Sequence, residues 1–273
     1  AESLQKVLGE DFKVFVSMRY WHPMAADVVR QVKAYEPDDI VLLPLYPQYS
    51  TTTTRSSLED WQKQAQRQGL SPKRSPKSCV IGCYPFQDGF IAASADLVKQ
   101  AFDAFVAKHG TRPRVLFSAH GLPEKIVDQG DPYQWECEQG AARIAAATGI
   151  DHLDWMSCYQ SRVGPLKWIG PSTEDALKKA ATDKVPVLIY PHAFVSEHVE
   201  TLVEIEQEYR HMAHEFGVPA FERVPTVSCH PAFITGLADL VRNALSENAK
   251  ESRICPIDRA QCCRTDIDKI FGN

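Results

Sequence analysis

Short apolar runs rich in β-branched residues alternate along the chain with longer amphipathic stretches. The runs predict strands at 12–17, 40–46, 79–84, 114–119, 153–159, 185–190 and, more weakly, 223–228. The stretches between them predict helices near 24–35, 57–68, 87–108, 133–148, 172–182, 196–216 and 232–247. This alternation is typical of βαβ units, in which helices cover both faces of a parallel sheet. It predicts an α/β fold whose strand ends carry the chemistry.

The same pattern divides into two Rossmann-like lobes, each a parallel sheet flanked by helices. The polar stretch 108–113, which contains Gly110 and Pro113, is the predicted boundary. We therefore expect a first lobe over 1–109 and a second over 110–234. The remaining residues, 235–273, are expected to form a helix that returns to the first lobe and a cysteine-bearing tail.

Composition narrows the class of protein. The chain has 273 residues, is 44% hydrophobic and 24% charged, and carries a net charge of −5, as an ordinary globular protein does. These values exclude a disordered chain and a general nucleic-acid binder, which would be strongly basic. No run approaches the ~18 to 20 apolar residues of a membrane-spanning helix. Eight cysteines are too few for a disulfide scaffold of this size.

His120 ends one predicted strand in the segment Ser118-Ala-His-Gly-Leu-Pro123, where glycine and proline force a turn. A histidine at the carboxyl end of a parallel strand lies where open α/β sheets bind ligands. Its neutral imidazole can accept a proton or bind a metal. A structural histidine that hydrogen-bonds at the turn is the alternative.

A row of carboxylates follows the predicted strand at 185–190. Glu197, Glu200, Glu204 and Glu208 recur at spacings of three and four, which places them on one face of an α-helix, with His198 beside the first of them. Like charges at this spacing repel, so the row requires solvent or a cation. A solvated helix face and a ladder of oxygen ligands that passes divalent metal or protons both remain open.

Aromatic residues stand near several predicted strand ends. Tyr20, Trp168 and Phe194 either cap a core or line a cleft for a flat, apolar ligand. The hydroxyl-rich loop at 45–57 has neither the P-loop pattern nor the glycine pattern of a dinucleotide site. Nucleotide chemistry is therefore unsupported.

Three of the cysteines, Cys255, Cys262 and Cys263, fall close together in the tail. In a protein without secretory features, this spacing favours metal or iron–sulfur ligation over disulfides. A [2Fe–2S] cluster takes four cysteines, so the body must supply one. Cys79 and Cys83 would lie about 13 Å apart along a strand, so only one of them can serve. A zinc site and free thiols are the alternatives.

These segments together resemble the ferrochelatase family, whose members insert Fe²⁺ into protoporphyrin IX to give protohaem, the last step of haem biosynthesis. The similar motifs occur in family order along the chain. They are Arg19-Tyr20 with His22-Pro23, Tyr46-Pro-Gln-Tyr-Ser50, Ser118-Ala-His-Gly-Leu-Pro123, Gly130-Asp-Pro-Tyr133, Gln160-Ser-Arg-Val-Gly-Pro165, Trp168-Ile-Gly-Pro171 and Glu197-His-Val-Glu-Thr-Leu202.

The resemblance implies roles for the candidate residues. It makes His120 the active-site histidine and Glu200 its partner carboxylate on the opposite face of the porphyrin. The residues of the acidic row along which metal or protons travel are then Glu197, His198, Glu204 and Glu208. The residues implied to contact the porphyrin are Tyr20, Trp168 and Phe194.

The resemblance also implies a cofactor. Family members with a C-terminal extension bind a [2Fe–2S] cluster through one body cysteine and three tail cysteines. The matching residues here are Cys83, Cys255, Cys262 and Cys263. Asp258 stands where the animal pattern has a cysteine and Cys262 is additional, as in some bacterial members. We expect the cluster to have a structural or sensing role.

Family members begin with a further strand and a helical lip that closes over the porphyrin, and nothing before Ala1 supplies them. If this were the whole chain, we would expect weak porphyrin binding and little activity. If it is a fragment or a processed form, the function belongs to the parent protein.

Several alternatives remain open at this point. Another tetrapyrrole chelatase, acting with cobalt or on coproporphyrin, is the nearest one. A tetrapyrrole or metal carrier without turnover and an iron–sulfur sensor are the others. The expected partners are protoporphyrin IX and Fe²⁺, with no nucleic acid, while peripheral membrane association and a homodimer stay open. The bacterial-type tail favours the cytoplasm, at the inner membrane, with the mitochondrial matrix as the alternative.

Overall fold

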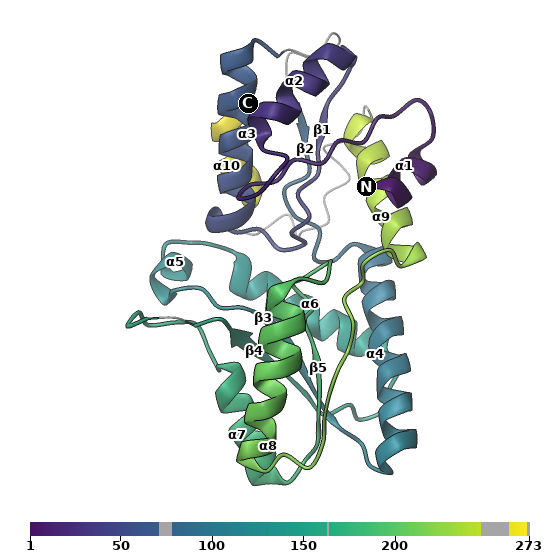
Figure 1. The fold of residues 1–273 in the computed structure, drawn as a ribbon, viewed down its shortest axis with the longest axis vertical. Helices are drawn as coiled ribbons and strands as arrows, with labels where there is room; N and C mark the ends of the chain where they lie inside the picture. The colour runs from purple at the N-terminus through teal and green to yellow at the C-terminus, as the bar shows by residue number, and fades with distance from the viewer. Residues whose placement is uncertain (71–77, 163, 247–261, 272–273) are drawn as a thin grey trace. The chain divides into compact units, whose positions relative to one another are not determined.

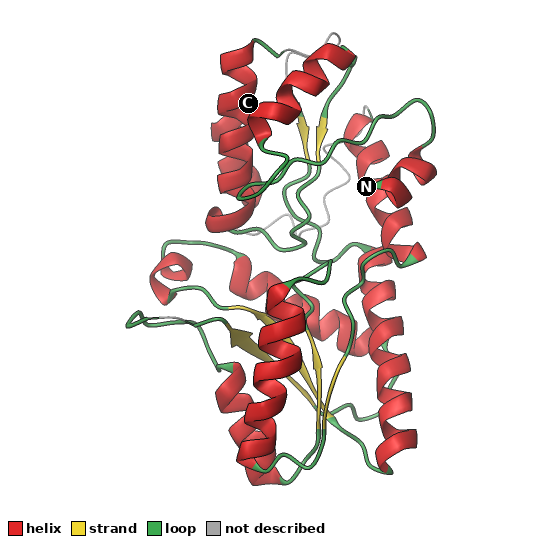
Figure 2. Cartoon of the chain, in the orientation of Figure 1, coloured by secondary structure: helices red, strands yellow, loops and turns green. Residues whose placement is uncertain are grey.

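The computed structural model describes residues 1–70, 78–162, 164–246 and 262–271. The chain forms two compact units (Figures 1 and 2). The first unit comprises 1–89 and 234–273, and the second comprises 90–233.

The second unit contains a parallel four-stranded sheet in the order β4-β3-β5-β6. Its strands are β3 (Arg114–His120), β4 (Trp155–Gln160), β5 (Val187–Tyr190) and β6 (Phe221–Arg223). Its helices are α4 (Asp88–His109), α5 (Glu124–Asp128), α6 (Tyr133–Ala147), α7 (Thr173–Asp183), η2 (Glu200–Tyr209) and α8 (Arg210–Phe216). The predicted α/β fold with parallel strands flanked by helices is confirmed.

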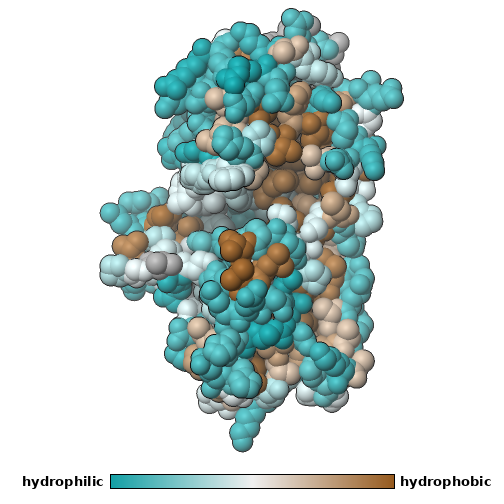
Figure 3. All heavy atoms as spheres, in the orientation of Figure 1, coloured by the Kyte–Doolittle hydropathy of each residue, from teal (hydrophilic) through white to brown (hydrophobic). Residues whose placement is uncertain are grey.

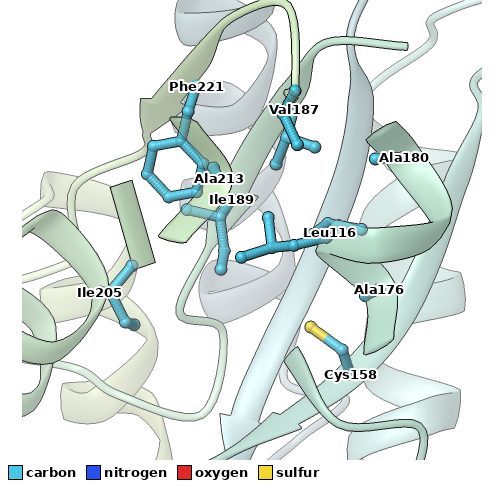
Figure 4. Packing of buried hydrophobic residues seen from close by; sticks show 11 residues of the cluster. Leu116, Cys158, Ala176, Ala180, Val187, Ile189, Ile205, Ala213 and Phe221 are labelled. Carbon is cyan, nitrogen blue, oxygen red and sulfur yellow. The ribbon is translucent and has the colours of Figure 1, made fainter. Parts of the chain in front are cut away.

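Apolar side chains from this sheet and its helices form one core (Figure 4). Leu116 of β3 and Ile189 of β5 are completely buried, as expected for central strands covered on both faces. They pack with side chains of α7, η2 and α8, among them Ala176, Ala180, Ile205 and Ala213. The core therefore fixes the strand ends and the start of η2, from which the candidate residues project.

The first unit has a two-stranded parallel sheet of β1 (Val41–Leu42) and β2 (Cys79–Val80). Both strands are shorter than the apolar runs that predicted them, since Pro44 has no N–H to continue the ladder. The helices are α1 (Glu2–Leu8), α2 (Ala25–Tyr35), η1 (Thr51–Arg55), α3 (Ser56–Gln68), α10 (Cys263–Phe271) and most of α9 (Pro231–Leu245).

The strand predicted at 12–17 is wrong, because this segment joins no sheet among the described residues. Its backbone bonds instead to the side-chain amide of Gln5. Gln5 Nε2 donates to Phe12 O at 2.9 Å, and Val14 N donates to Gln5 Oε1 at 2.8 Å. One side chain thus takes the place of a neighbouring strand.

The predicted boundary at 109/110 also differs from the structure, in which the chain passes between units at 89/90 and 233/234. Helix α4 belongs almost entirely to the second unit, because its buried face packs there. Tyr190 OH in β5 and Ser94 Oγ in α4 lie 2.8 Å apart, and both side chains are buried. Helix α10, near the C-terminus, belongs to the first unit.

Some apolar side chains reach the surface. In the second unit Val199, Leu202 and Val203 are exposed at the start of η2, and Figure 3 shows hydrophobic surface over the helix that continues into α8. In the first unit Tyr20 and Trp21 are exposed. Within the described part of the chain, no helix has the length and hydropathy needed to span a membrane.

Candidate active site

The carboxyl ends of β3 and β4 bring His120 next to the loop that follows β4. In the parallel register His120 pairs with Gln160, so Ser161 is the first residue beyond the ladder. Gly121 turns the chain directly after His120, and a Cβ there would lie 2.9 Å from Gln160 O. The sequence reasoning placed the histidine correctly at a strand end.

His120 and Glu200 form the centre of the site. His120 Nδ1 and Glu200 Oε2 are 2.8 Å apart, and both side chains are partly exposed. Burial raises the pKa of Glu200, but the hydrogen bond and charge of His120, the charge of His198 and a bond from Ser161 outweigh it, so the pKa falls below its usual value. Glu200 is therefore an anion at neutral pH.

The structure therefore brings together the two residues that the resemblance pairs as active-site histidine and partner carboxylate.

Glu204 lies behind Glu200 and is held by four donors without positive charge. Ser161 N donates to Oε1 at 2.8 Å and Ser161 Oγ to Oε2 at 2.6 Å. Gln160 Nε2 donates at 3.3 Å and Tyr209 OH at 3.0 Å. The carboxylate is fixed in place without a cationic partner among the described residues.

The helix that carries these carboxylates is a π-helix over Glu200–Tyr209, in which hydrogen bonds join residues five apart. The α-helical spacing predicted from the sequence is therefore wrong for this stretch. The wider turn brings Tyr209 back to Glu204, five residues earlier. It also removes Glu208 from the row, because Glu208 is exposed and makes no hydrogen bond or ion pair within the described chain.

Glu197 faces away from His120, toward β6. Arg223 Nη1 donates to its two carboxylate oxygens at 3.0 and 3.1 Å, and Thr226 N donates to Oε1 at 2.9 Å. Burial raises the pKa of Glu197, but bonds from Thr201, Thr226 and Arg223 lower it further. Its charge is already compensated, so the structure does not support the implied role in a metal path.

Arg223 extends this ion network along the helix. Its Nε donates to Glu206 Oε2 at 3.0 Å, and Glu206 Oε1 accepts from Arg210 Nη2 at 2.6 Å. Neither Glu206 nor Arg223 stood out in the sequence, because they lie on different elements and belong to no motif.

His198 is oriented by the backbone. Its Nδ1 accepts a hydrogen bond from Glu200 N at 3.2 Å, so in the neutral ring the proton is on Nε2. Its backbone N–H is bound by Thr201 Oγ1 at 2.9 Å. His198 therefore lies against the start of η2, with its Nδ1 bound by the backbone N–H of Glu200.

The three aromatic candidates occupy different places. Trp168 lies beside Gly121, the residue after His120, since a Cβ on Gly121 would be 3.4 Å from Trp168 Cε3. Phe194 packs edge-on against His198, with ring centroids 4.8 Å apart. Tyr20 belongs to the first unit, where it is 72% exposed and stacks under Arg19 at 4.7 Å.

The cysteines converge in the first unit. Cys83 Sγ and Cys263 Sγ are 3.5 Å apart, and Cys262 packs in the same cluster of side chains. Hydrogen bonds from Cys262 and Cys83 lower the pKa of Cys263 to about 4, so it is a thiolate at neutral pH. Cys255 lies outside the described residues.

Helix α10, which begins at Cys263, docks closely against the residue before Cys83. A Cβ on Gly82 would lie 2.7 Å from Cys263 Sγ and 2.5 Å from Ile267 Cδ1, so only glycine fits. Tyr49 OH donates to Asp266 Oδ2 at 3.1 Å. Cys83 and Cys263, two of the cysteines implied as cluster ligands, are thus in contact, and Cys262 packs beside them.

No group of three or more His, Cys, Asp or Glu side chains among the described residues is arranged to hold a metal ion. His120 and Glu200 are two such groups, with Glu204 held behind them.

Two α/β units, each with a parallel sheet, make up the fold, and solved structures share it. The solved structure of SirB from Bacillus subtilis with Fe³⁺ superposes with a TM-score of 0.55 at 15% identity, over 85% of this chain and 81% of that one. A second structure, sirohydrochlorin chelatase SirB from subspecies spizizenii in complex with cobalt, gives the same TM-score at 13% identity, over 87% and 81%. At these identities the likeness shows the fold alone.

The sequence comparisons identify the family. The ferrochelatase family model matches residues 1–245. Ferrochelatase from Caulobacter vibrioides NA1000 is 48% identical over 239 residues, which cover 88% of this chain and 66% of that protein. Ferrochelatase from Phenylobacterium zucineum is 44% identical over 268 residues, 97% of this chain and 75% of its own length. The chain belongs to the ferrochelatase family and spans about two thirds of the Caulobacter relative.

Proposed function

We propose that this chain carries the catalytic site of a ferrochelatase, which inserts Fe²⁺ into protoporphyrin IX to form protohaem and releases two protons. Family membership supports the reaction class. The observation that carries the proposal is the 2.8 Å contact between His120 Nδ1 and Glu200 Oε2 at the carboxyl edge of the sheet.

The pair is arranged to take protons from the pyrrole nitrogens. Because Glu200 is an anion, it accepts from His120 Nδ1–H, and His120 Nε2 is left with its lone pair. Nε2 accepts the first pyrrole proton, and Glu200 stabilises the imidazolium that forms. This is the use of a carboxylate to orient and charge-balance a histidine base.

The same side chains suit a metal ion that is transferred from the protein to the porphyrin. Glu200 Oε1 has no hydrogen-bond partner in the described part of the chain, so an oxygen ligand is open beside the base. Two or three protein ligands hold Fe²⁺ weakly enough for the four porphyrin nitrogens to replace them. A tighter protein site would retain the substrate metal.

Apolar surface near the pair supports binding of a flat, apolar ring. Val199, Leu202 and Val203 are exposed around Glu200 in sequence, and Trp168 lies beside Gly121, the residue after His120. We also assign Phe194 and Tyr20 to the porphyrin site, on the resemblance. Exposed apolar groups of this kind are typical of binding sites.

We further propose that Cys83, Cys255, Cys262 and Cys263 hold a [2Fe–2S] cluster. The 3.5 Å separation of Cys83 Sγ and Cys263 Sγ and the thiolate character of Cys263 support this set. Visible iron–sulfur absorption of the purified protein tests it. Cys263→Ser should abolish the absorption, whereas Cys229→Ser, at an exposed thiol of the second unit, should retain it.

We also propose a cellular location and an oligomeric state. We place the protein in the bacterial cytoplasm, peripherally at the inner membrane, because its substrate is apolar. Cell fractionation tests this, and a purely soluble pool would contradict it. A homodimer, testable by sedimentation, is the oligomeric state we propose.

An anaerobic assay tests the function directly. Protein would be incubated with Fe²⁺ or Co²⁺ and with protoporphyrin IX or coproporphyrin, and metalloporphyrin formation followed by absorbance. The proposal expects the fastest turnover with Fe²⁺ and protoporphyrin IX. Faster turnover with Co²⁺ or coproporphyrin would favour another chelatase, and binding without turnover would favour a carrier.

A further inference from the structure

Ser161 has an unusual backbone conformation at the centre of the site. It directly follows β4 and has φ of 58°, in the left-handed region that non-glycine residues rarely adopt. Glycine would adopt this conformation more easily. Strained residues of this kind persist where surrounding contacts hold them, and they are frequent at functional sites.

The contacts that hold Ser161 are to the two carboxylates of the site. Its N–H and its hydroxyl grip the two oxygens of Glu204, at 2.8 and 2.6 Å. The same hydroxyl oxygen lies 3.4 Å from Glu200 Oε2, which also binds His120. One residue therefore contacts both members of the acidic pair.

The type of donor matters for what the pair can bind. Two neighbouring carboxylates repel each other, and proteins commonly relieve this with arginine or lysine. Arg223 does so for Glu197 and Glu206. At Glu204 the donors are a hydroxyl, a backbone N–H, an amide and a phenol, and none of them is a cation. Glu200 is bound by His120 and by the same Ser161 hydroxyl, without an arginine or a lysine.

We propose that Ser161 is a positioning residue that holds Glu200 and Glu204 side by side as a divalent-metal entry pair, through neutral hydrogen-bond donors in place of a cationic side chain. This inference rests on the proposed function for its catalytic consequence, but its binding consequence stands apart from turnover. The left-handed backbone is what directs both the N–H and the hydroxyl to Glu204.

Three substitutions separate the hydroxyl from the backbone. Ser161→Ala removes the hydroxyl and keeps the strain. Ser161→Gly also removes the hydroxyl but relieves the strain, so it should be at least as stable as the alanine variant. Ser161→Thr keeps a hydroxyl but should lower the melting temperature, because β-branched residues are disfavoured at positive φ.

Two readouts are needed, the KM for Fe²⁺ in the anaerobic assay and the affinity for Co²⁺ in an equilibrium titration without porphyrin. Loss of a residue that orients metal ligands typically costs about 10–100-fold in metal affinity or activity. We expect that loss in both the alanine and glycine variants, with the KM for porphyrin unchanged. Ser161→Thr should retain metal affinity despite its lower stability.

The matched control is Ser228, an exposed serine of the same unit that also has positive φ, 40°. Ser228→Ala and Ser228→Gly should leave both metal readouts within twofold of the unsubstituted chain. A loss at Ser161→Ala that Ser161→Gly restores would show a purely backbone role and overturn the proposal. Unchanged metal readouts in both Ser161 variants would also overturn it.

The outcomes for the two proposals are distinguishable. If the unsubstituted chain binds Co²⁺ but does not turn over, reduced Co²⁺ affinity in the Ser161 variants upholds the inference while the proposed function fails. If the chain turns over and the variants match it, the function stands and the inference fails. A chain with neither turnover nor Co²⁺ binding contradicts both.

Discussion

Glu200 and Glu204 lie on the β4 side of the π-helix, whereas Glu197 and Glu206 face β6, and different partners hold the two pairs. Arg223 compensates the charge of Glu197 and Glu206. The other pair has neutral donors and one histidine. Four carboxylates within nine residues of one another thus form two pairs with different partners: Glu197 and Glu206, which we call the structural pair, and Glu200 and Glu204, which we propose to bind a cation. Sequence spacing alone does not distinguish the two pairs.

The largest expected effect on activity is that of replacing His120, which contacts Glu200. His120→Ala should lower kcat for protohaem formation about 10²–10⁴-fold, the range typical of a general base. The melting temperature should change little, since His120 is partly exposed. His211→Ala is the matched control, because His211 is 74% exposed in α8 and pairs only with Glu215 in the described chain. Equal activity of the two variants would remove His120 from the mechanism.

Removing Arg223 should lower the stability of the protein, because Arg223 is the shared counter-ion of Glu197 and Glu206. Arg223→Met leaves Glu197 and Glu206 partly buried without their shared counter-ion, and we expect a loss of about 2 kcal/mol, between exposed and buried ion pairs. This corresponds to a fall of about 4–8 °C in melting temperature. Scanning calorimetry measures it, and the double variant with Glu197→Gln should recover part of the loss. No change in melting temperature would show that the network is not stabilising.

The contribution of Glu197 to stability should depend on pH. The pKa of Glu197 is lowered in the folded protein, so its contribution to stability is complete above the unfolded pKa of about 4.5 and is lost as pH falls through the folded value. The unfolding free energy should therefore decline below about pH 4.5. Burial lowers the pKa of His192 to about 4, so His192 also affects stability in this pH range. Its contribution is the same in the unsubstituted chain and in Arg223→Met, and it cancels when the stabilities of the two are compared.

Urea unfolding between pH 3 and 6 tests this. The difference in stability between the unsubstituted chain and Arg223→Met should shrink as pH falls below 4.5, because protonated Glu197 no longer needs the arginine. A difference that stays constant with pH would show that Arg223 acts through packing and not through charge.

The smallest expected effect sharpens the role of the neutral donors. Tyr209→Phe removes one of four hydrogen bonds to Glu204, from a hydroxyl at 3.0 Å. A single hydrogen bond contributes about 0.5–1.5 kcal/mol, so the KM for Fe²⁺ should rise about 2–10-fold. An unchanged KM for porphyrin is the internal control. A larger effect than at Ser161 would place the main support for Glu204 on the helix instead of the β4 loop.

The alternation of apolar runs was sufficient to predict the α/β fold, because the central strands β3 and β5 are buried on both faces and read as apolar runs. It also placed His120 at a strand end. The segment at 12–17 has the same composition, but the amide of Gln5 takes the place of a partner strand. The amino-acid composition of 12–17 does not show that a side chain will replace the partner strand.

The acidic row shows where sequence reasoning stops. The residues of η2 are all compatible with an α-helix, so the π-helical turn that joins Tyr209 to Glu204 is a property of the tertiary structure. Arg223 lies 26 residues after Glu197 and in another element. In the sequence, Ser161 is one residue of a motif similar to the family, and no role is predicted for it. Its positive φ is set by the contacts it makes in the folded chain, which the sequence does not show.

The most direct test of the account compares Glu200→Gln with Glu197→Gln in one experiment, with kcat for protohaem formation and melting temperature measured for both. We expect the two substitutions to have opposite effects on activity and on stability. Glu200→Gln should lose most of its activity with little loss of stability, and Glu197→Gln should lose stability while its folded fraction keeps more activity. Parallel losses in both variants, or the reverse assignment, would contradict the division of the helix into a cation-binding pair and a structural pair.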